Sequence, residues 1–207
     1  MSETTLIKDC TIVNEGVVKE SDLLIKNGRI EKIASGLSTD GITIDGSGLH
    51  LLPGVIDDQV HFREPGLTDR GNIKSESLAA IAGGTTSFMD MPNVLPPTLT
   101  NDLWLEKINI ASRHASANFS FYMGSSNENI DEIRAINPLE VCGLKVFMGA
   151  STGNLLVDNQ ESLDSIFREA PVIITTHCED TPMIKAKEQE YIDKYGNDIP
   201  IEAHAEI

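Results

Sequence analysis

The chain has 207 residues, of which 40% are hydrophobic and 23% are charged, as expected for a globular protein with its own core. Its 16 Lys and Arg residues stand against 32 Asp and Glu residues, and the net charge of -16 argues against a nucleic-acid-binding surface, which needs clustered cations. There is no long apolar run, no secretory pattern at the start and no cysteine framework, so we expect a cytoplasmic protein without membrane contact.

Residues 1–52 predict a small β unit. Short apolar runs alternate with turn residues, and Asn27-Gly28 is the strongest short signal for a hairpin. Residues 29–33 alternate apolar and charged side chains, as a half-buried strand does, and residues 42–46 predict a further strand that ends in a turn. No helical period occurs in this part of the sequence.

From residue 53 the pattern changes to alternating strands and helices. The predicted strands cover residues 53–61, 85–91, 117–123, 143–148 and 171–177. The predicted helices cover residues 73–82, 101–115, 128–136, 160–169 and 181–195. Strands that are separated by crossover helices pair in parallel, which predicts an α/β fold. A doubly wound open sheet and a (β/α)8 barrel both fit this rhythm, and periodicity alone does not decide between them.

The length of the chain bears on the barrel alternative. Five predicted strands follow the β unit, whereas a (β/α)8 barrel takes about 250 residues for itself. If the fold is a barrel, we expect a TIM-type barrel truncated after about strand 5. The predicted domains are then a small β unit over 1–52, part of a flanking β-sandwich, and the first part of the barrel over 53–207.

The segment over residues 53–66 carries the densest set of chemically active side chains. If the strand alternation continues to its end, one face presents Asp57, Gln59, His61 and Arg63. Acid, amide, imidazole and guanidinium groups are unsuited to a hydrophobic core and suited to a catalytic or binding site, which in a barrel lies at the C-terminal ends of the strands. The alternative is an edge strand whose polar face meets solvent.

Three later strands end in, or contain, further candidates. Asn93 follows the predicted strand over 85–91, either as a site residue or as a turn residue that bonds its own backbone. Lys145 lies inside an apolar strand, where burial lowers the pKa of an amine and lets it react with carbon dioxide; a Lys that reaches solvent is the alternative. His177 ends an apolar strand as a metal ligand or base, or as a core histidine with a satisfied hydrogen bond.

Taken together, these segments resemble the amidohydrolase superfamily and, within it, the dihydroorotases. The first strand of that family carries two His separated by one residue, an Arg two further on and then Glu-Pro-Gly, which residues 54–66 resemble. Residues 91–93 resemble its substrate-binding turn, residues 143–149 the segment whose Lys becomes carboxylated, and residues 176–180 its strand-5 metal segment. The resemblance covers essentially the whole chain, and the combined motif set is specific where a single motif is not.

The resemblance implies a zinc-dependent cyclic amide hydrolase with one or two zinc ions. The metal ligands that it implies are His61, carboxylated Lys145, His177 and, as a further candidate, Gln59. Arg63 and Asn93 would bind the carboxylate of a small-molecule substrate. The implied reaction is the reversible cyclisation of N-carbamoyl-L-aspartate to L-dihydroorotate in de novo pyrimidine biosynthesis. The family's catalytic Asp would lie beyond Ile207, and the family implies a homodimer.

One departure from the family keeps other functions open. Gln59 stands where the first metal-binding His usually stands, and a neutral amide is a much weaker zinc ligand than an imidazole. A dihydropyrimidinase or allantoinase is a second interpretation, although Arg63 favours a substrate with a carboxylate. A catalytically silent dihydroorotase-like scaffold subunit is a third.

Overall fold

The computed structural model describes residues 3–149 and 153–206, and the chain divides into two compact units. The first unit is Met1–Gly54 and the second is Val55–Ile207, so the division falls two residues after the position where the sequence pattern changes. None of the helices in the described ranges is long and apolar enough to cross a membrane. Each unit is described separately below.

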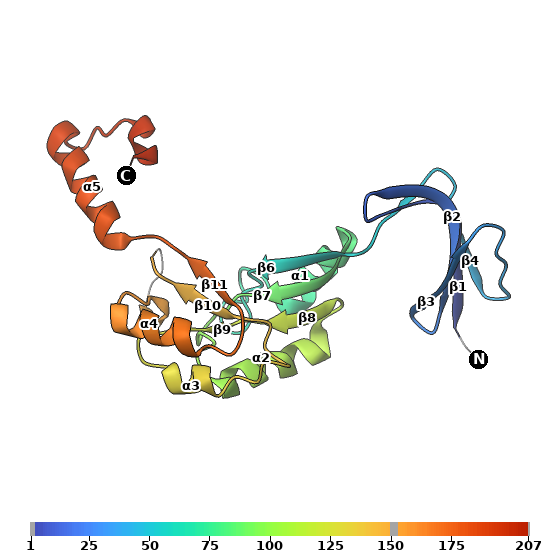
Figure 1. The fold of residues 1–207 in the computed structure, drawn as a ribbon, viewed down its shortest axis with the longest axis horizontal. Helices are drawn as coiled ribbons and strands as arrows, with labels where there is room; N and C mark the ends of the chain where they lie inside the picture. The colour runs from blue at the N-terminus through green and yellow to red at the C-terminus, as the bar shows by residue number, and fades with distance from the viewer. Residues whose placement is uncertain (1–2, 150–152, 207) are drawn as a thin grey trace. The chain divides into compact units, whose positions relative to one another are not determined.

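The first unit is a single β-sheet over its described residues (Figure 1). Its strands are β1 (Thr4–Asn14), β2 (Val17–Lys26), β3 (Arg29–Ala34), β4 (Ile42–Asp45) and β5 (His50–Leu51). The order is β3-β2-β1-β4, and β5 also pairs with β1. The predicted hairpin at Asn27-Gly28 is confirmed: it joins the antiparallel strands β2 and β3, and both turn residues have positive φ. The sandwich that would include this sheet stays a prediction.

The second unit has the predicted α/β pattern of parallel strands and helices. Its strands are β6 (Val55–Val60), β7 (Thr85–Asp90), β8 (Asn118–Phe121), β9 (Met123–Gly124), β10 (Leu144–Phe147) and β11 (Ile174–His177). They form two parallel sheets, β6-β7-β8 and β9-β10-β11, and only Tyr122 separates β8 from β9. The strand predicted over 117–123 is therefore broken at one residue, and the strand predicted over 171–177 begins at Ile174.

The helices of the second unit match the sequence pattern closely. They are α1 (Ile73–Ala82), α2 (Asn101–His114), α3 (Ile130–Arg134), α4 (Gln160–Glu169) and α5 (Thr181–Tyr195), with short 3-10 helices at Gly153–Leu155 and Ile201–Ala205. The predicted bounds of α1, α4 and α5 are confirmed, whereas α3 is shorter than predicted. All but α3 begin after a capping side chain that accepts a backbone hydrogen bond, namely Asn72, Thr100, Asn159 or Asp180.

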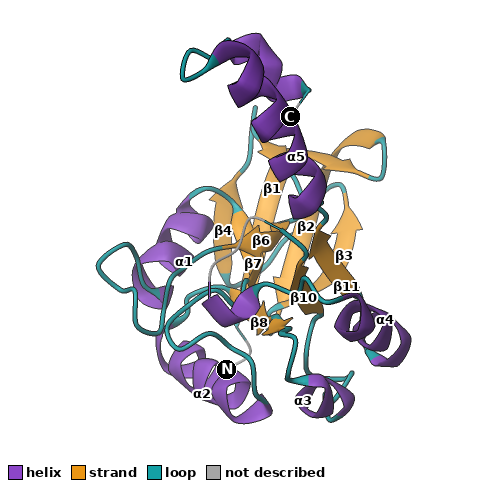
Figure 2. Cartoon of the chain, turned by 90° about the vertical axis from the view of Figure 1, so that its left-hand side faces the viewer, coloured by secondary structure: helices purple, strands orange, loops and turns teal. Residues whose placement is uncertain are grey.

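The core of the second unit lies between its strands and helices α1 to α4. In Figures 1 and 2, α2, α3 and α4 lie on the same side of the strands. Fully buried side chains such as Ile73, Phe88, Phe121 and Leu144 come from both layers. Because the strands are parallel, the residues that follow them meet at one edge of the sheet, where a site is expected in such folds. An eight-stranded barrel around these strands stays a prediction.

Candidate active site

The segment after β6 leaves the strand earlier than the alternation pattern predicted. β6 ends at Val60, and a register shift interrupts its pairing with β7 between Asp57 and Val60. Phe62 is buried in the core, and Arg63 has a φ of 67°. The left-handed backbone turns the chain at this residue, so Arg63 is presented by a loop and not by the strand.

His61 is held by the loop that follows β7. Its Nδ1 lies 2.8 Å from Oδ1 of Asn93, and because an amide oxygen only accepts, Nδ1 carries the proton and donates. Burial lowers the pKa of the His61 imidazole, and the Asn93 hydrogen bond opposes that shift. The positive charges of Arg63 and Lys145 lower the pKa further. A neutral imidazole with its Nδ1 proton engaged has Nε2 as the nitrogen for a metal ion.

Arg63, in the loop after β6, contacts Asn93, in the loop after β7. The guanidinium of Arg63 donates from Nη1 to the backbone carbonyl of Asn93 over 3.4 Å. The two loops are also joined where Leu95 N donates to Pro65 O over 3.1 Å. Gly66, at φ 81°, packs so closely on Leu95 that a side chain there would collide with the Leu95 carbonyl. The loop after β6 is therefore fixed against the loop after β7.

A cavity of about 440 Å³ opens between these loops. Its polar lining residues are Arg63, Arg70, Asn93 and Asn154, and its apolar ones are Leu67, Val94, Leu95, Pro97 and Leu155. Two guanidinium groups on one cavity favour an anionic ligand. Sequence reasoning missed Arg70, although its position in the same loop as Arg63, just before the Asn72 helix cap, is a signal that could have suggested it.

Lys145 and His177 lie on neighbouring strands and share the ring of Phe147. Lys145 is only 3% exposed, and its Nζ lies 5.0 Å from the centroid of the Phe147 ring. His177 pairs with Phe147 in the register of β10 and β11, and the two rings stack with centroids 5.2 Å apart. The side chains of Lys145 and His177 therefore flank the same aromatic ring, and the charge of Lys145 contributes to the lowered pKa of His61.

His177 has a buried nitrogen without a hydrogen bond, and Lys145 has no ion-pair partner, among the residues that the structure describes. Nδ1 of His177 is buried without a hydrogen-bond partner in the described part of the chain. Burial lowers the pKa of Lys145, and among residues 3–149 and 153–206 no carboxylate is within ion-pairing distance of its Nζ. Buried polar groups in proteins nearly always have partners, so these two are suited to bind a group from outside the chain.

Gln59 and Cys178 are exposed, unlike His61, Lys145 and His177. Gln59 is exposed on β6, and its backbone N–H donates to Oδ1 of Asp57. Cys178 is exposed just after β11 ends at His177, and its Sγ is 2.8 Å from Oγ1 of Thr176.

The donor set decides whether the site suits a metal ion. Within residues 3–149 and 153–206, no group of three or more His, Cys, Asp or Glu side chains is arranged to hold one. Two imidazoles and one amine fit zinc only if Lys145 supplies oxygen ligands, as a carboxylated lysine does. The unpartnered Nδ1 of His177 and the lowered pKa of Lys145 are compatible with that requirement.

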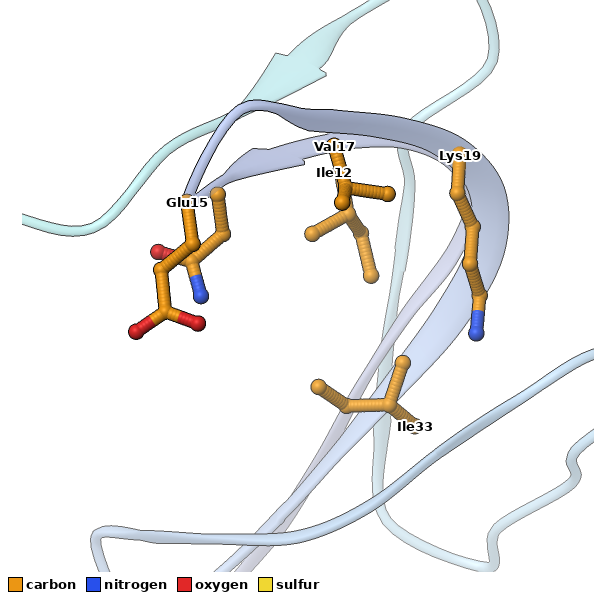
Figure 3. A pocket seen from close by; sticks show the side chains of 6 residues that line it. Ile12, Glu15, Val17, Lys19 and Ile33 are labelled. Atoms are coloured by element: carbon orange, nitrogen blue, oxygen red, sulfur yellow. The ribbon is translucent and has the colours of Figure 1, made fainter.

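A second cavity, in the first unit, has none of the predicted site residues. It measures about 260 Å³ and is lined by Ile12, Asn14, Glu15, Val17, Lys19 and Ile33. Figure 3 shows its aliphatic side chains together with Glu15 and Lys19. Without a cluster of polar groups that converge on one point, this concave face of the sheet is a weaker candidate for catalysis.

Comparison with known proteins shows where the chain belongs. No protein-family model matches it. It is 34% identical over 189 residues to a dihydroorotase from Methanosarcina acetivorans, an alignment that covers 88% of this chain and 40% of that protein. It is 35% identical over 153 residues to an allantoinase from Deinococcus radiodurans, covering 73% of this chain and 34% of that one.

A solved structure is similar along nearly the whole chain. The L-hydantoinase (dihydropyrimidinase) from Arthrobacter aurescens superposes with a TM-score of 0.86 at 30% identity, over 96% of this chain and 45% of that one. The chain thus spans less than half the length of these relatives. The chain belongs to the amidohydrolase superfamily, among the cyclic amidohydrolases that include dihydroorotases, hydantoinases and allantoinases.

Proposed function

We propose that this chain carries the first part of the active site of a dihydroorotase, which interconverts N-carbamoyl-L-aspartate and L-dihydroorotate in pyrimidine biosynthesis. The observation that carries the proposal is the joint placement of Arg63 and Asn93 on one cavity, with His61 bonded to the same Asn93. That arrangement puts a carboxylate-binding pair next to a metal-ligand candidate.

The carboxylate of the substrate is the part of the ligand that these residues recognise. The guanidinium fork of Arg63 suits two carboxylate oxygens, and Asn93 keeps its amide N–H groups while its Oδ1 accepts from His61. Arg70, on the same cavity, adds positive charge. The apolar lining residues exclude water around the ring of the substrate.

The metal residues proposed here are His61, carboxylated Lys145 and His177. The lowered pKa of Lys145 favours its neutral amine, which is the form that attacks carbon dioxide; a C–N bond forms and a proton leaves to solvent. When bound there, zinc supplies an activated water and polarises the amide carbonyl. Gln59 is a further and weaker ligand candidate, because it is exposed and has a neutral amide. One or two zinc ions are compatible with these ligands.

A hydantoinase is the second candidate, because a solved L-hydantoinase matches 96% of the chain with a TM-score of 0.86. Its ring substrates do not need a carboxylate-binding Arg. Arg63 on the cavity is therefore the feature that separates the two candidates in this chain.

The test uses the protein expressed from its complete reading frame, supplied with zinc and bicarbonate. Loss of L-dihydroorotate is followed by its ultraviolet absorbance, with hydantoin and allantoin as comparison substrates. Selective loss of L-dihydroorotate is the expected result. Selective turnover of hydantoin or allantoin would replace the proposal by another cyclic amidohydrolase, and a folded, zinc-loaded but inactive protein would favour the silent scaffold.

A further inference from the structure

An ion pair lies fully buried beneath the two loops of the site. Asp90 is the last residue of β7, and Lys107 lies in the middle of α2. Nζ of Lys107 is 2.6 Å from Oδ2 of Asp90, and neither side chain has any exposed surface. The Lys107 ammonium also lies 4.8 Å from the centroid of the Phe121 ring. Sequence reasoning missed both residues, although an Asp at the end of an apolar strand is a signal for a buried partner.

Each member of the pair also bonds the backbone of one site loop. Oδ1 of Asp90 accepts from the Phe62 N–H over 2.9 Å, and Phe62 lies between His61 and Arg63. Nζ of Lys107 donates to the carbonyl of Met91 over 2.9 Å, two residues before Asn93. A single pair of charges thus connects the loop after β6 to the loop after β7.

Stability alone does not require such a pair. Burial lowers the pKa of Lys107, against the opposing effect of Asp90, which reflects the cost of removing an ammonium from water. A well-packed apolar pair of similar volume stabilises a core as well or better. Charge-assisted hydrogen bonds are, however, shorter and more directional than apolar contacts, so they fix the atoms that they join.

We propose that Asp90 and Lys107 are positioning residues, which set the relative placement of the loop over 61–63 and the loop over 91–93. Neither residue lines the cavity. They act through the backbone of Phe62 and Met91 on the side chains of the two loops, namely His61, Arg63 and Asn93. The inference deepens the proposed function and rests on it only for its kinetic test.

The main variant is Asp90→Asn combined with Lys107→Met in the protein from its complete reading frame. The double change removes both charges together, so that neither is left unpaired, and leaves the Met91 carbonyl without its donor. The matched control is Ile166→Ala, a cavity in helix α4 at a side chain that is 1% exposed. The control lowers stability from a helix that carries neither Asp90 nor Lys107.

Two measurements distinguish positioning from a purely structural role. Hydrogen exchange should become faster in peptides over 60–67 and 91–98 in the double variant and should not in the control. KM for L-dihydroorotate should rise about tenfold with kcat nearly kept, because a misplaced Arg63 or Asn93 weakens carboxylate binding.

The outcomes separate the inference from the proposed function. Unchanged exchange in both segments of a folded variant overturns the inference, and so does a loss of kcat at constant KM. If the wild type does not turn over L-dihydroorotate, the proposed function fails and the exchange result alone decides the inference. If the double variant does not fold, Asp90→Glu keeps both charges but displaces the carboxylate, and the same two measurements apply to it.

Discussion

The two ends of the candidate site differ in how far the chain satisfies its own polar groups. At the β6–β7 end, His61 bonds Asn93, Arg63 bonds the Asn93 carbonyl, and Asp90 pairs with Lys107 below them. At the β10–β11 end, Lys145 and His177 both lie against the Phe147 ring. In the described part of the chain, Oδ2 of Asp90 and Nδ1 of His177 are both buried without a hydrogen bond, but Oδ2 of Asp90 lies 2.6 Å from the Lys107 ammonium and Nδ1 of His177 has no such ion pair.

The difference indicates which end of the candidate site has its hydrogen bonds in place without a bound ligand or metal ion. A buried polar atom without a hydrogen bond costs free energy, so each one calls for an explanation, and at a candidate site a bound water, ion or ligand is the first to test. Under the proposed function, the β6–β7 end is pre-organised for the substrate carboxylate, whereas the β10–β11 end is arranged for the metal ion. Four experiments test this contrast.

The largest effect is expected at Lys145. Lys145→Met removes the amine that carbon dioxide would modify, and kcat/KM should fall at least about a hundredfold, because metal activation is worth several kcal/mol. Zinc content, measured by atomic emission, should fall in parallel while circular dichroism stays the same. Lys185→Met, at an exposed position on α5, is the control. Full zinc content in the Lys145 variant would contradict the proposed ligand set.

Arg63 should give the next largest effect. Arg63→Lys keeps the charge but loses the fork, and kcat/KM for L-dihydroorotate should fall about tenfold to a hundredfold, the range for a lost hydrogen bond to a charged group. Zinc content should not change, because Arg63 is not among the proposed metal ligands. Arg70→Lys, at the exposed second guanidinium of the cavity, should have a smaller effect. A parallel loss of zinc in the Arg63 variant would argue against a carboxylate-binding role.

A substitution of Asn93 tests whether this proposed substrate-binding residue also supports His61, a proposed metal ligand. Asn93→Ala removes the acceptor of the His61 Nδ1 proton, and zinc affinity should fall about tenfold to a hundredfold, as for other partners of metal-bound imidazoles. Competition with a fluorescent chelator measures that affinity. Asn118→Ala, at an exposed position on β8, should leave it unchanged. Unchanged affinity in both variants would mean that the hydrogen bond does not orient His61 for a metal.

The smallest expected effect is a local change in hydrogen exchange when zinc binds. Adding zinc to metal-free protein should slow hydrogen exchange at residues 144–148 and 174–178 more than at residues 60–63, because the latter loop already has its partners. Exchange measured by mass spectrometry, with and without a chelator, gives the comparison. If zinc slowed exchange equally in the segments after β6 and in β10 and β11, the contrast between the two ends of the site would be wrong.

Much of the fold could be predicted because its signals are local. The hairpin at Asn27-Gly28 and the bounds of α1, α4 and α5 follow from turn residues, caps and apolar spacing within a few positions. The break at Tyr122 and the left-handed backbone of Arg63 could not be predicted in this way, since neighbouring loops and strands impose them.

The candidate site was predictable as a set of residues and not as a set of contacts. Arg63 and Asn93 were expected to share a substrate carboxylate because the resemblance to the dihydroorotases implies it; the residue type of Asn93 alone was equally compatible with a turn. The bond from His61 to Asn93 joins positions 32 apart in the sequence, and the pair of Asp90 and Lys107 joins positions 17 apart on a strand and a helix. Such partners depend on how α2 packs against β7, which a single sequence does not specify.

Asn93 also limits how this protein can be redesigned. One residue serves the imidazole through its side chain and the guanidinium through its carbonyl, so a substitution chosen to accept a new substrate would disturb His61 at the same time. Arg70 and Leu67 line the same cavity and have no such bond to His61. A library that aims to broaden the ring substrates should therefore vary the loop positions 67 and 70 and keep Asn93 constant.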